Sequence, residues 1–272
     1  MNNNMAIVVQ PWRSELISSL PGVIHAATRR VAGMGAADGN VGFGSPRDRD
    51  DAWAMRQRWC QAAGLDAERL VTLGQVHGAE VHRVGAADAG RGAAPGSPQI
   101  GLGDALITDA PGPALMTLHA DCQPVFFADP ERRAVAVAHA GWRGTVANVV
   151  GETVAAMTET FGSRPHDIRA SLGPAIQRCC YDVGEEVVTA WQDRAGSEAS
   201  AALKVEGDRV HLSLTTANAL LLLRAGIPEA NIERSTICTR CHGEHWFSHR
   251  GQGPHTGRFG AMIAIAPDGM RW

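Results

Sequence analysis

Two apolar runs, residues 123–128 and 134–138, dominate the segment LHADCQPVFFADPERRAVAVAHAGWRG at residues 118–144. Each run has the length of a strand, and the Asp-Pro-Glu sequence at 129–131 between them is typical of a turn. The segment therefore predicts an antiparallel hairpin, which commits the middle of the chain to a β-sheet.

The predicted hairpin carries Cys122 before one strand and His139 after the other. If the turn is centred on the bond between residues 130 and 131, these two residues face each other, with Cβ atoms roughly 5 Å apart. That separation suits two ligands of one metal ion, or a thiol and its general base. His119 and Asp121 precede Cys122 and are candidates to orient such a group.

The remaining elements mix strands and helices without strict alternation, which favours an α+β fold over a doubly wound sheet. We expect a single catalytic domain over residues 1–272, with a mixed, largely antiparallel β-sheet core flanked by helices. A stretch rich in Gly, Ala, Pro and Ser at residues 85–103 predicts a flap. Strands are predicted at residues 5–9, 22–27, 70–75, 80–84, 104–108, 114–120, 168–172, 232–237 and 259–264. Helices are predicted at residues 50–63, 185–191 and 213–225 and, as one helix, directly after Gly144.

Charge and residue usage exclude several classes of protein. The chain has 25 basic and 28 acidic side chains, a formal net charge of −3, which argues against a protein that wraps nucleic acid. Lys204 is the only lysine, so Schiff-base chemistry and a lysine-bearing P-loop have almost no candidate residue. The sequence shows neither a signal-peptide core nor a membrane-length apolar run. We therefore expect a cytoplasmic monomer or homodimer with reduced thiols and no membrane partner.

A third ligand candidate is His77, which lies in the turn sequence GQVHGAEVH between two predicted strands. One thiolate with two imidazoles is a ligand set of catalytic zinc sites, which leave a fourth position open for water or substrate. After His139 the chain reads Gly-Trp-Arg-Gly at 141–144 and then enters a helix. The amide groups at this helix start, beside Arg143, form a candidate anion site.

The motifs around these candidates resemble those of the YfiH-like family, whose members are known both as laccase-type polyphenol oxidoreductases and as purine nucleoside phosphorylases. The resemblance covers about residues 20 to 265, and the motifs occur in family order. They are Gln-Val-His-Gly at 75–78, Asp-Ala-Leu-Ile-Thr at 104–108, Ala-Asp-Cys-Gln-Pro at 120–124, His-Ala-Gly-Trp-Arg-Gly at 139–144, Leu-Gly-Pro-Ala-Ile at 172–176, Cys-Tyr at 180–181, Val-Gly at 183–184, Cys-Thr at 238–239, Phe-Ser-His-Arg at 247–250 and Thr-Gly-Arg at 256–258.

The resemblance implies that His77, Cys122 and His139 bind zinc and form the catalytic centre. It also implies phosphorolysis of adenosine, inosine and methylthioadenosine, together with deamination of adenosine. A purine nucleoside and phosphate are then the expected small-molecule partners. Two departures bear on substrate preference. The family's Gly-Phe-Ser-Thr-Arg is replaced by Ile-His-Ala-Ala-Thr-Arg at 24–29, and its Arg-Arg-Asp-Gly by Arg-Gly-Gln-Gly at 250–253.

Arginine and histidine side chains near the end of the chain are candidates for contacting substrate. Guanidinium groups suit the oxygens of phosphate and ribose. His249, Arg250 and Arg258, together with Arg143, are therefore predicted substrate-binding residues. The alternative is that this histidine-rich loop is only a solvated surface.

Three other functions remain open. A copper-linked polyphenol oxidase would hold copper in the same three-ligand site, although multinuclear copper clusters need closely spaced imidazoles and the chain contains no His-x-His. A metal-free thiol enzyme would use Cys122 as nucleophile and His139 as base, in a role such as editing peptidoglycan precursors. A zinc-stabilised binding module would have no activity.

The other five cysteines are interpreted without a catalytic role. Cys60 lies on the apolar face of its predicted helix, and the adjacent Cys179 and Cys180 are interpreted as packing or backbone-positioning residues. The sequence Cys-Thr-Arg-Cys-His at 238–242 matches a haem attachment pattern, but that function needs an exported protein. A structural zinc ribbon would need a second cysteine pair. Neither haem attachment nor zinc binding is therefore assigned to residues 238–242.

Overall fold

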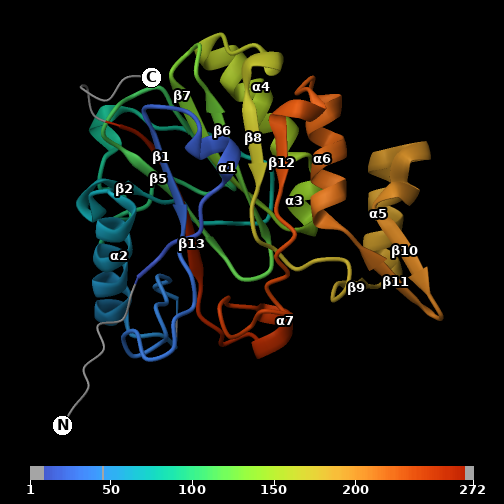
Figure 1. Cartoon of the computed structure of the whole chain (residues 1–272), viewed down its shortest axis with the longest axis horizontal. Helices are drawn as coiled ribbons and strands as arrows, with labels where there is room; N and C mark the ends of the chain where they lie inside the picture. Colours follow the sequence, from blue (N-terminus) through green and yellow to red (C-terminus); the bar gives the residue numbers. More distant parts are fainter. Residues whose placement is uncertain (1–8, 45, 267–272) are drawn as a thin grey trace.

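The computed structural model describes residues 9–44 and 46–266, which form a four-layer sandwich (Figure 1). Helix α2 (Arg49–Ala63) covers a four-stranded sheet, which packs on a six-stranded sheet. Helices α4 (Val149–Phe161) and α6 (Leu214–Arg224) cover the outer face of the six-stranded sheet. The predicted α+β fold with a mixed, largely antiparallel core is therefore confirmed.

The six-stranded sheet has the order β12-β8-β6-β7-β4-β3. Its outermost pairs, β12 with β8 and β3 with β4, are parallel, and the pairs between them are antiparallel. The strands are β3 (Val81–Arg83), β4 (Ala105–Thr108), β6 (Gln123–Asp129), β7 (Ala134–Ala140), β8 (Arg169–Leu172) and β12 (Ile232–Arg234).

The four-stranded sheet has the order β1-β13-β5-β2, and a small third sheet has the order β10-β11-β9. The four-stranded sheet consists of β1 (Val23–Ala27), β2 (Leu70–Val71), β5 (Ala114–His119) and β13 (Phe259–Ile265). The small sheet consists of β9 (Asp182–Val183), β10 (Leu203–Glu206) and β11 (Arg209–Leu212). The remaining α-helices are α1 (Glu15–Ser18), α3 (Trp142–Val146), α5 (Glu185–Ala195) and α7 (His249–Gln252).

Alternating side chains of the central hairpin fill both faces of the six-stranded sheet. Val135 and Val137 of β7 pack toward the four-stranded sheet, whereas Ala134 and Ala136 pack toward α4 and α6. All seven residues of β6 and of β7 are buried. Burial on both faces explains why these strands are apolar at almost every position.

The hairpin of β6 and β7 is confirmed, but the predicted register is wrong. The strands pair Pro124 with His139, so the turn is centred one residue later than expected. Asp129 stabilises this turn, because its carboxylate accepts the amide N–H groups of residues 131 and 132 at 2.9 and 3.1 Å. His139 is opposite residue 124, two positions after the expected partner Cys122. Because side chains alternate between the two faces, a shift of two keeps them on the same face, so Cys122 and His139 are diagonal neighbours.

One other expectation needs correction. The single helix expected after Gly144 is divided into α3 and α4 at Asn148, whose φ of 71° is incompatible with a continuous helix. The stretch at 85–103, predicted as a flap, is joined near its end to the segment after β2, because Gly101 accepts the amide of Gly74 at 2.8 Å and Ile100 donates to Thr72 at 3.0 Å. The strand predicted at 5–9 lies outside the described residues except for its last position.

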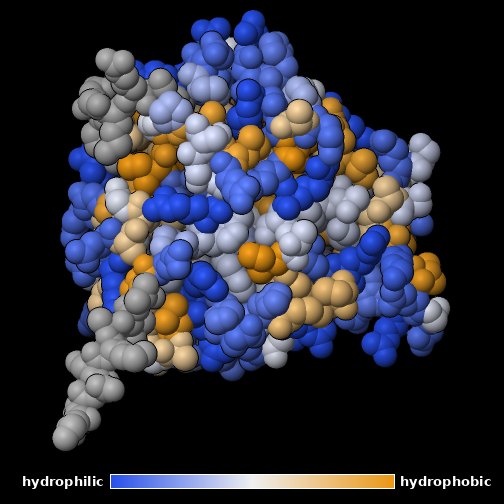
Figure 2. Space-filling model, viewed as in Figure 1, coloured by the Kyte–Doolittle hydropathy of each residue, from blue (hydrophilic) through white to orange (hydrophobic). Residues whose placement is uncertain are grey.

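The surface carries no broad apolar face in the orientation of Figure 1. Hydrophilic residues cover most of it, and apolar residues lie in small separate groups (Figure 2). Within residues 9–44 and 46–266, none of the helices combines the length and the hydropathy that crossing a bilayer requires.

Candidate metal centre and active-site pocket

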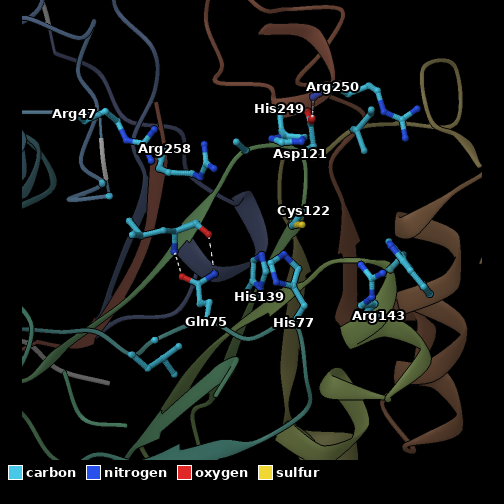
Figure 3. A pocket seen from close by; sticks show the side chains of 18 of the residues that line it. Arg47, Gln75, His77, Asp121, Cys122, His139, Arg143, His249, Arg250 and Arg258 are labelled. Atoms are coloured by element: carbon cyan, nitrogen blue, oxygen red, sulfur yellow. Dashed lines mark hydrogen bonds between the residues drawn. The ribbon is translucent and has the colours of Figure 1, made fainter. Parts of the chain in front are cut away.

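The three predicted metal ligands converge at one point in the fold (Figure 3). One ligand atom from each of His77, Cys122 and His139 lies within 4.8 Å of the others. The rings of His77 and His139 meet edge to face with their centroids 4.9 Å apart. His77 comes from the loop before β3, Cys122 from the residue before β6 and His139 from β7. The group can therefore hold a metal ion.

Glycine at position 141 leaves room for this group. A Cβ atom there would lie 2.8 Å from the Cys122 Sγ and 3.3 Å from the His77 ring. The φ of Gly141 is −77°, which any residue can adopt, so the requirement is steric and not conformational. Gly141 also begins α3, which places the start of that helix against the thiol.

Asp104 holds two of the three ligands in place. Its carboxylate accepts the backbone N–H groups of His77 at 3.1 Å and Gly78 at 2.6 Å, and it accepts the ring N–H of His139 Nδ1 at 2.8 Å. The other ring nitrogen of His139, Nε2, is then the one free to bind a metal. The side chain of Asp104 is fully buried, and the hydrogen bonds from His139 and Gly78 outweigh burial and lower its pKa.

Gln75 fixes the loop that carries His77. Its side-chain amide pairs with the backbone of Leu118 in β5, donating from Nε2 and accepting at Oε1, both at 2.8 Å (Figure 3). The loop is thus joined to the four-stranded sheet by Gln75 and to the six-stranded sheet by Asp104. These hydrogen bonds fix the backbone on both sides of His77, whereas its side chain is exposed. The φ of His77 is 61°, so the backbone is left-handed at this residue.

The charges of the group favour a thiolate. Burial opposes ionisation of Cys122, but the charge of His139 and hydrogen bonds from His139 and His77 outweigh it and lower the pKa of the thiol to about 6. Burial likewise opposes protonation of His139, but the Cys122 thiolate and Asp104 outweigh it and raise the pKa of the imidazole to about 9. Both shifts favour the thiolate and imidazolium forms of the metal-free pair, and a thiolate is the form that binds metal.

The metal group lies in a cavity of about 580 Å³, a volume in the usual range of small-molecule sites. All four predicted substrate-binding residues, Arg143, His249, Arg250 and Arg258, line this cavity. Figure 3 shows Arg143 on one side of Cys122 and Arg258 on the opposite side. The structure therefore brings the predicted metal ligands and the predicted substrate-binding residues together.

The predicted arginines differ in how much of their charge faces the cavity. The guanidinium of Arg250 donates to Asp182 Oδ1 at 2.9 Å, so its charge is already paired. The guanidinium of Arg143 stacks on the Trp142 ring, 4.2 Å from its centroid, and the side chain is 58% exposed. Arg258 is partly buried, and burial together with the nearby charge of Arg47 lowers its pKa.

Arg47 also lines the pocket, although no sequence pattern distinguishes it from the other arginines among the 24 in the chain. Its guanidinium and that of Arg258 both donate to the carbonyl oxygen of Thr256, at 2.7 and 2.8 Å. The Nε of Arg47 is buried and has no hydrogen-bond partner in the described part of the chain. Two neighbouring guanidinium groups repel each other until an anion lies between them, so this arginine pair favours a phosphate-like group.

Of the two residues predicted to orient the metal ligands, His119 contacts Cys122 and Asp121 contacts a different segment. His119 Nδ1 lies 3.1 Å from the carbonyl oxygen of Cys122, which positions the backbone of the ligand. The carboxylate of Asp121 accepts the Thr239 hydroxyl and the Arg250 amide, each at 2.6 Å. Asp121 therefore fixes the segment that carries His249 and not the metal ligands directly.

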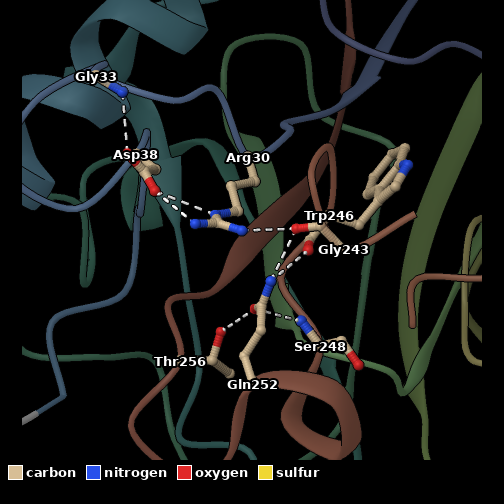
Figure 4. Close-up of polar contacts among 8 residues, drawn as sticks. All are labelled: Arg30, Gly33, Asp38, Gly243, Trp246, Ser248, Gln252 and Thr256. Atoms are coloured by element: carbon tan, nitrogen blue, oxygen red, sulfur yellow. Dashed lines mark hydrogen bonds and ion pairs between the residues drawn. The ribbon is translucent and has the colours of Figure 1, made fainter. Parts of the chain in front are cut away.

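Residues 250–253, where the chain differs from the family motif, include Gln252, whose side chain has a structural role. Gln252 accepts the amide of Ser248 at 3.0 Å and the hydroxyl of Thr256 at 2.6 Å, and donates to the carbonyl of Gly243 at 2.8 Å (Figure 4). Arg30 donates to the same carbonyl at 2.7 Å. The glutamine thus holds the loop around α7 in shape and does not line the cavity.

A family model described as multi-copper polyphenol oxidoreductase laccase matches residues 24–266. This range includes every residue that lines the cavity.

The chain belongs to this family. Among relatives of this laccase-type protein, purine nucleoside phosphorylase YlmD of Geobacillus stearothermophilus is 36% identical over 225 residues, which cover 82% of each chain. A protein named adenosine deaminase RL5, from an unidentified prokaryote, is 36% identical over 156 residues, 57% of this chain and 59% of its own. A crystal structure of YlmD from Geobacillus stearothermophilus matches with a TM-score of 0.87 at 33% identity, covering 93% of this chain and 94% of that chain.

Proposed function

We propose that this laccase-type family member is a zinc-dependent purine nucleoside phosphorylase that also deaminates adenosine. Adenosine, inosine and methylthioadenosine are the proposed substrates, and residues 1–272 act as one catalytic domain. The names of the relatives support this reaction class. The observation that carries the proposal is a single cavity with the His77, Cys122 and His139 group at its centre and the pair of Arg47 and Arg258 at its side.

The donor set fits zinc. One thiolate and two imidazoles leave an open fourth position in a tetrahedral site. A bound zinc ion would supply Lewis-acid activation of water or of a substrate atom at that position. Asp104 would keep His139 in the tautomer that a ligand requires, through its hydrogen bond to Nδ1.

In phosphorolysis, the arginine pair would bind and orient phosphate. An oxygen of hydrogen phosphate attacks the ribosyl C1′ carbon and the bond from C1′ to the purine nitrogen breaks. The proton of hydrogen phosphate passes to that nitrogen, and ribose 1-phosphate and the free base leave. Arg47 and Arg258 hold the attacking anion without needing a proton transfer, because a guanidinium stays charged near neutral pH. His249 lines the same cavity beside Asp121 and is proposed to hold a proton close to the departing base.

The test is a nucleoside assay with and without phosphate, on a sample whose metal content is measured. We expect about one zinc held by the His77, Cys122 and His139 group, and adenine release from adenosine only when phosphate is present. Equal release without phosphate would remove the phosphorylase assignment, and absence of inosine would remove the deaminase assignment. Arg258→Gln should raise the KM for phosphate more than the KM for adenosine, whereas Arg164→Gln on the surface should change neither.

A metal-free thiol enzyme is the second candidate, and one observation favours it. Cys122, His139 and Asp104 form a thiolate, an imidazolium and a carboxylate in sequence, with the last two 2.8 Å apart. Such an enzyme could act on peptidoglycan precursors. His77→Ala separates the two functions, because a thiol enzyme keeps its turnover and a zinc enzyme loses metal and turnover together.

A copper-linked polyphenol oxidase is the function that the name of the family suggests. Copper fits the same three ligands, but the described residues contain only one metal-holding group with imidazoles. Oxygen consumption with a phenol by the copper-loaded protein, absent from the zinc-loaded protein, would favour this function over the phosphorylase.

A further inference from the structure

Four cysteines that are far apart in the sequence meet at the surface of the fold. Cys179 and Cys180 follow β8, and Cys238 and Cys241 follow β12. Their sulfur atoms all lie within 4.8 Å of one another. Cys180 packs against the core as expected, but Cys179 is exposed. One expectation is wrong, because the cysteine pair at 238–241 does have a second pair beside it.

The topology of the six-stranded sheet creates this meeting. Strands β8 and β12 are parallel neighbours, so both chains leave the sheet at the same edge. The two loops run side by side after the strands, as Figure 1 shows, and a parallel bridge joins Ala175 to Cys238. Backbone pairing directly before the cysteines therefore brings the two loops together, so the cluster does not depend on a chance approach of surface side chains.

The distances match four ligands of one ion. The Sγ atoms of Cys179 and Cys180 lie 3.6 and 3.3 Å from the Sγ of Cys241. Four thiolates at the usual zinc–sulfur distance of about 2.3 Å form a tetrahedron whose sulfur atoms are roughly 3.8 Å apart. All four cysteines are free thiols, so none of them is used in a disulfide.

The surroundings of Cys238 favour a sulfur that carries negative charge, whereas burial and the neighbouring sulfur atoms raise the pKa of the Cys179 and Cys180 thiols while no cation is bound. The backbone N–H of Gln177 points at the Sγ of Cys238 at 3.4 Å, and an amide donor stabilises a thiolate. Arg240 lies within the same loop and donates to the carbonyl of Cys180 at 3.2 Å. Cys238 is buried, whereas Cys179 and Cys241 are exposed, so one side of the cluster is open to an arriving ion.

We propose that Cys179, Cys180, Cys238 and Cys241 bind a structural zinc ion, separate from the group at His77, Cys122 and His139. Four thiolates leave no open position, so this ion holds chain segments together and does no chemistry. A zinc ion at the cysteine site would join the loops after β8 and β12. Without the ion, only backbone hydrogen bonds would hold these loops together.

The site lies directly behind one wall of the active-site cavity. Tyr181, which lines the cavity, follows Cys180 in the chain. Thr239, which follows Cys238, donates its hydroxyl to Asp121, and Asp121 accepts the Arg250 amide. Zinc at the four cysteines would therefore fix both Tyr181 and the residue before Cys122.

The test compares zinc content between full-length variants purified under reducing conditions. His77→Ala removes a ligand of the first group, so its remaining zinc reports the cysteine site. We expect one zinc per chain in His77→Ala and none after Cys179→Ser and Cys241→Ser are added. X-ray absorption of the His77→Ala protein should show only sulfur neighbours, at about 2.3 Å.

A matched control is His242→Ala, because His242 is exposed and adjacent to Cys241. In the wild-type background this variant should keep all of the zinc of the wild-type protein. The proposal is overturned if the His77→Ala protein, reduced and supplied with excess zinc, retains no zinc. It is also overturned if its zinc has nitrogen neighbours, or if the added cysteine substitutions leave the zinc content unchanged. Because the readout is metal and not turnover, it is independent of the proposed activity.

Discussion

Asp104 is one carboxylate that serves two ligands of the candidate metal site. It accepts hydrogen bonds from the His139 ring and from the backbone of the loop that carries His77. A neutral amide at this position could satisfy some of these donors, but its NH₂ group would face others. The orientation of both imidazoles therefore depends on the charge and the two acceptor atoms of this side chain.

Asp104→Asn should weaken zinc binding by about 10- to 100-fold, the usual effect of losing a partner of a metal-bound imidazole. The zinc Kd, measured by competition with a coloured chelator, checks this. Asp109→Asn is the control, because Asp109 is an exposed carboxylate paired only loosely with Arg83 at 3.5 Å. An unchanged Kd in Asp104→Asn would show that Asp104 does not position the ligands.

Gly141→Ala should also weaken zinc binding, through volume alone. The added Cβ would lie 2.8 Å from the Cys122 sulfur, so the thiol must move. Gly184→Ala is a close control, since Gly184 also begins a helix with almost the same backbone, φ −78° and ψ 171°, and has nothing within 4 Å of its Cβ position. We expect the zinc Kd to rise tenfold or more for Gly141→Ala only. Equal values for the two variants would contradict the steric explanation.

Residue patterns pointed to His77, Cys122 and His139 but not to Asp104 or Arg47 as functional residues. The three ligands are recognisable because their side-chain types bind metals and occur at informative places in the hairpin and in family motifs. Asp104 lies before a strand and acts through a neighbouring strand, and Arg47 reaches Arg258 across more than 200 residues. These contacts depend on how the strands and sheets pack together, and a local sequence pattern carries no information about that packing.

At the scale of elements, strand β1 contains a buried histidine that couples its stability to pH. His25 is 1% exposed and its Nε2 accepts the backbone N–H of Ser14 at 2.8 Å, so the neutral ring is the form that fits. Burial chiefly, and the charge of Arg13, lower its pKa from 6.5 to about 4. The pKa of His25 is therefore lower in the folded protein than in the unfolded chain. The resulting contribution to the free energy of unfolding is complete above pH 6.5 and is lost as the pH falls from 6.5 toward 4.

His25→Gln should make unfolding less sensitive to acid, because glutamine can accept the same hydrogen bond without gaining a proton. Between pH 7.5 and 5.0 the wild-type protein should lose about 2 kcal/mol more of its unfolding free energy than the variant. Urea unfolding at the two pH values measures this difference. His166→Gln, a change at a side chain that is 57% exposed, should behave like the wild type. Parallel pH curves for wild type and His25→Gln would count against the assignment.

Element types were easier to predict than their registers and neighbours. The apolar runs at β6 and β7 predict a hairpin, but its register follows from the Asp129 carboxylate in the turn. The helix after Gly144 shows a continuous apolar face, yet Asn148 breaks it with a left-handed backbone. Cys179 and Cys238 meet only because β8 and β12 are parallel neighbours, which is a property of the sheet and not of either segment.

At the scale of the whole molecule, the arginine pair predicts that phosphate stabilises the fold. Binding at a hundred times the Kd adds about 2.7 kcal/mol to the free energy of unfolding, because only the folded chain brings Arg47 and Arg258 together. For a chain of this size the Tm should rise by roughly 5 to 10 °C. Thermal unfolding in phosphate, against chloride at equal ionic strength, measures the shift. Arg258→Gln should lose most of it and Arg164→Gln should keep it, and equal shifts in the two variants would place phosphate elsewhere.

The class of fold was predictable because strands and helices follow each other without alternation, and the central strands are apolar throughout. The layered arrangement could not be predicted, because it depends on the pairing of β1, β5 and β13, which are far apart in the sequence. These long-range pairings put the four-stranded sheet behind the six-stranded one and bring the loops of His77, Arg47 and His249 around one cavity.

Two residues at the centre of that cavity have left-handed backbones without being glycine, His77 with a φ of 61° and Asp121 with a φ of 84°. Each such residue costs roughly 1 kcal/mol or more. Glycine would relieve that cost at either position, but it would also remove an imidazole ligand or the carboxylate that holds Thr239 and Arg250. At 121 the loss of two buried hydrogen bonds to a carboxylate outweighs the relief of strain, whereas the His77 side chain is exposed. Laboratory selection for heat resistance of the metal-free protein should therefore enrich glycine at 77 and not at 121, so a thermostable variant needs its activity screened at every round.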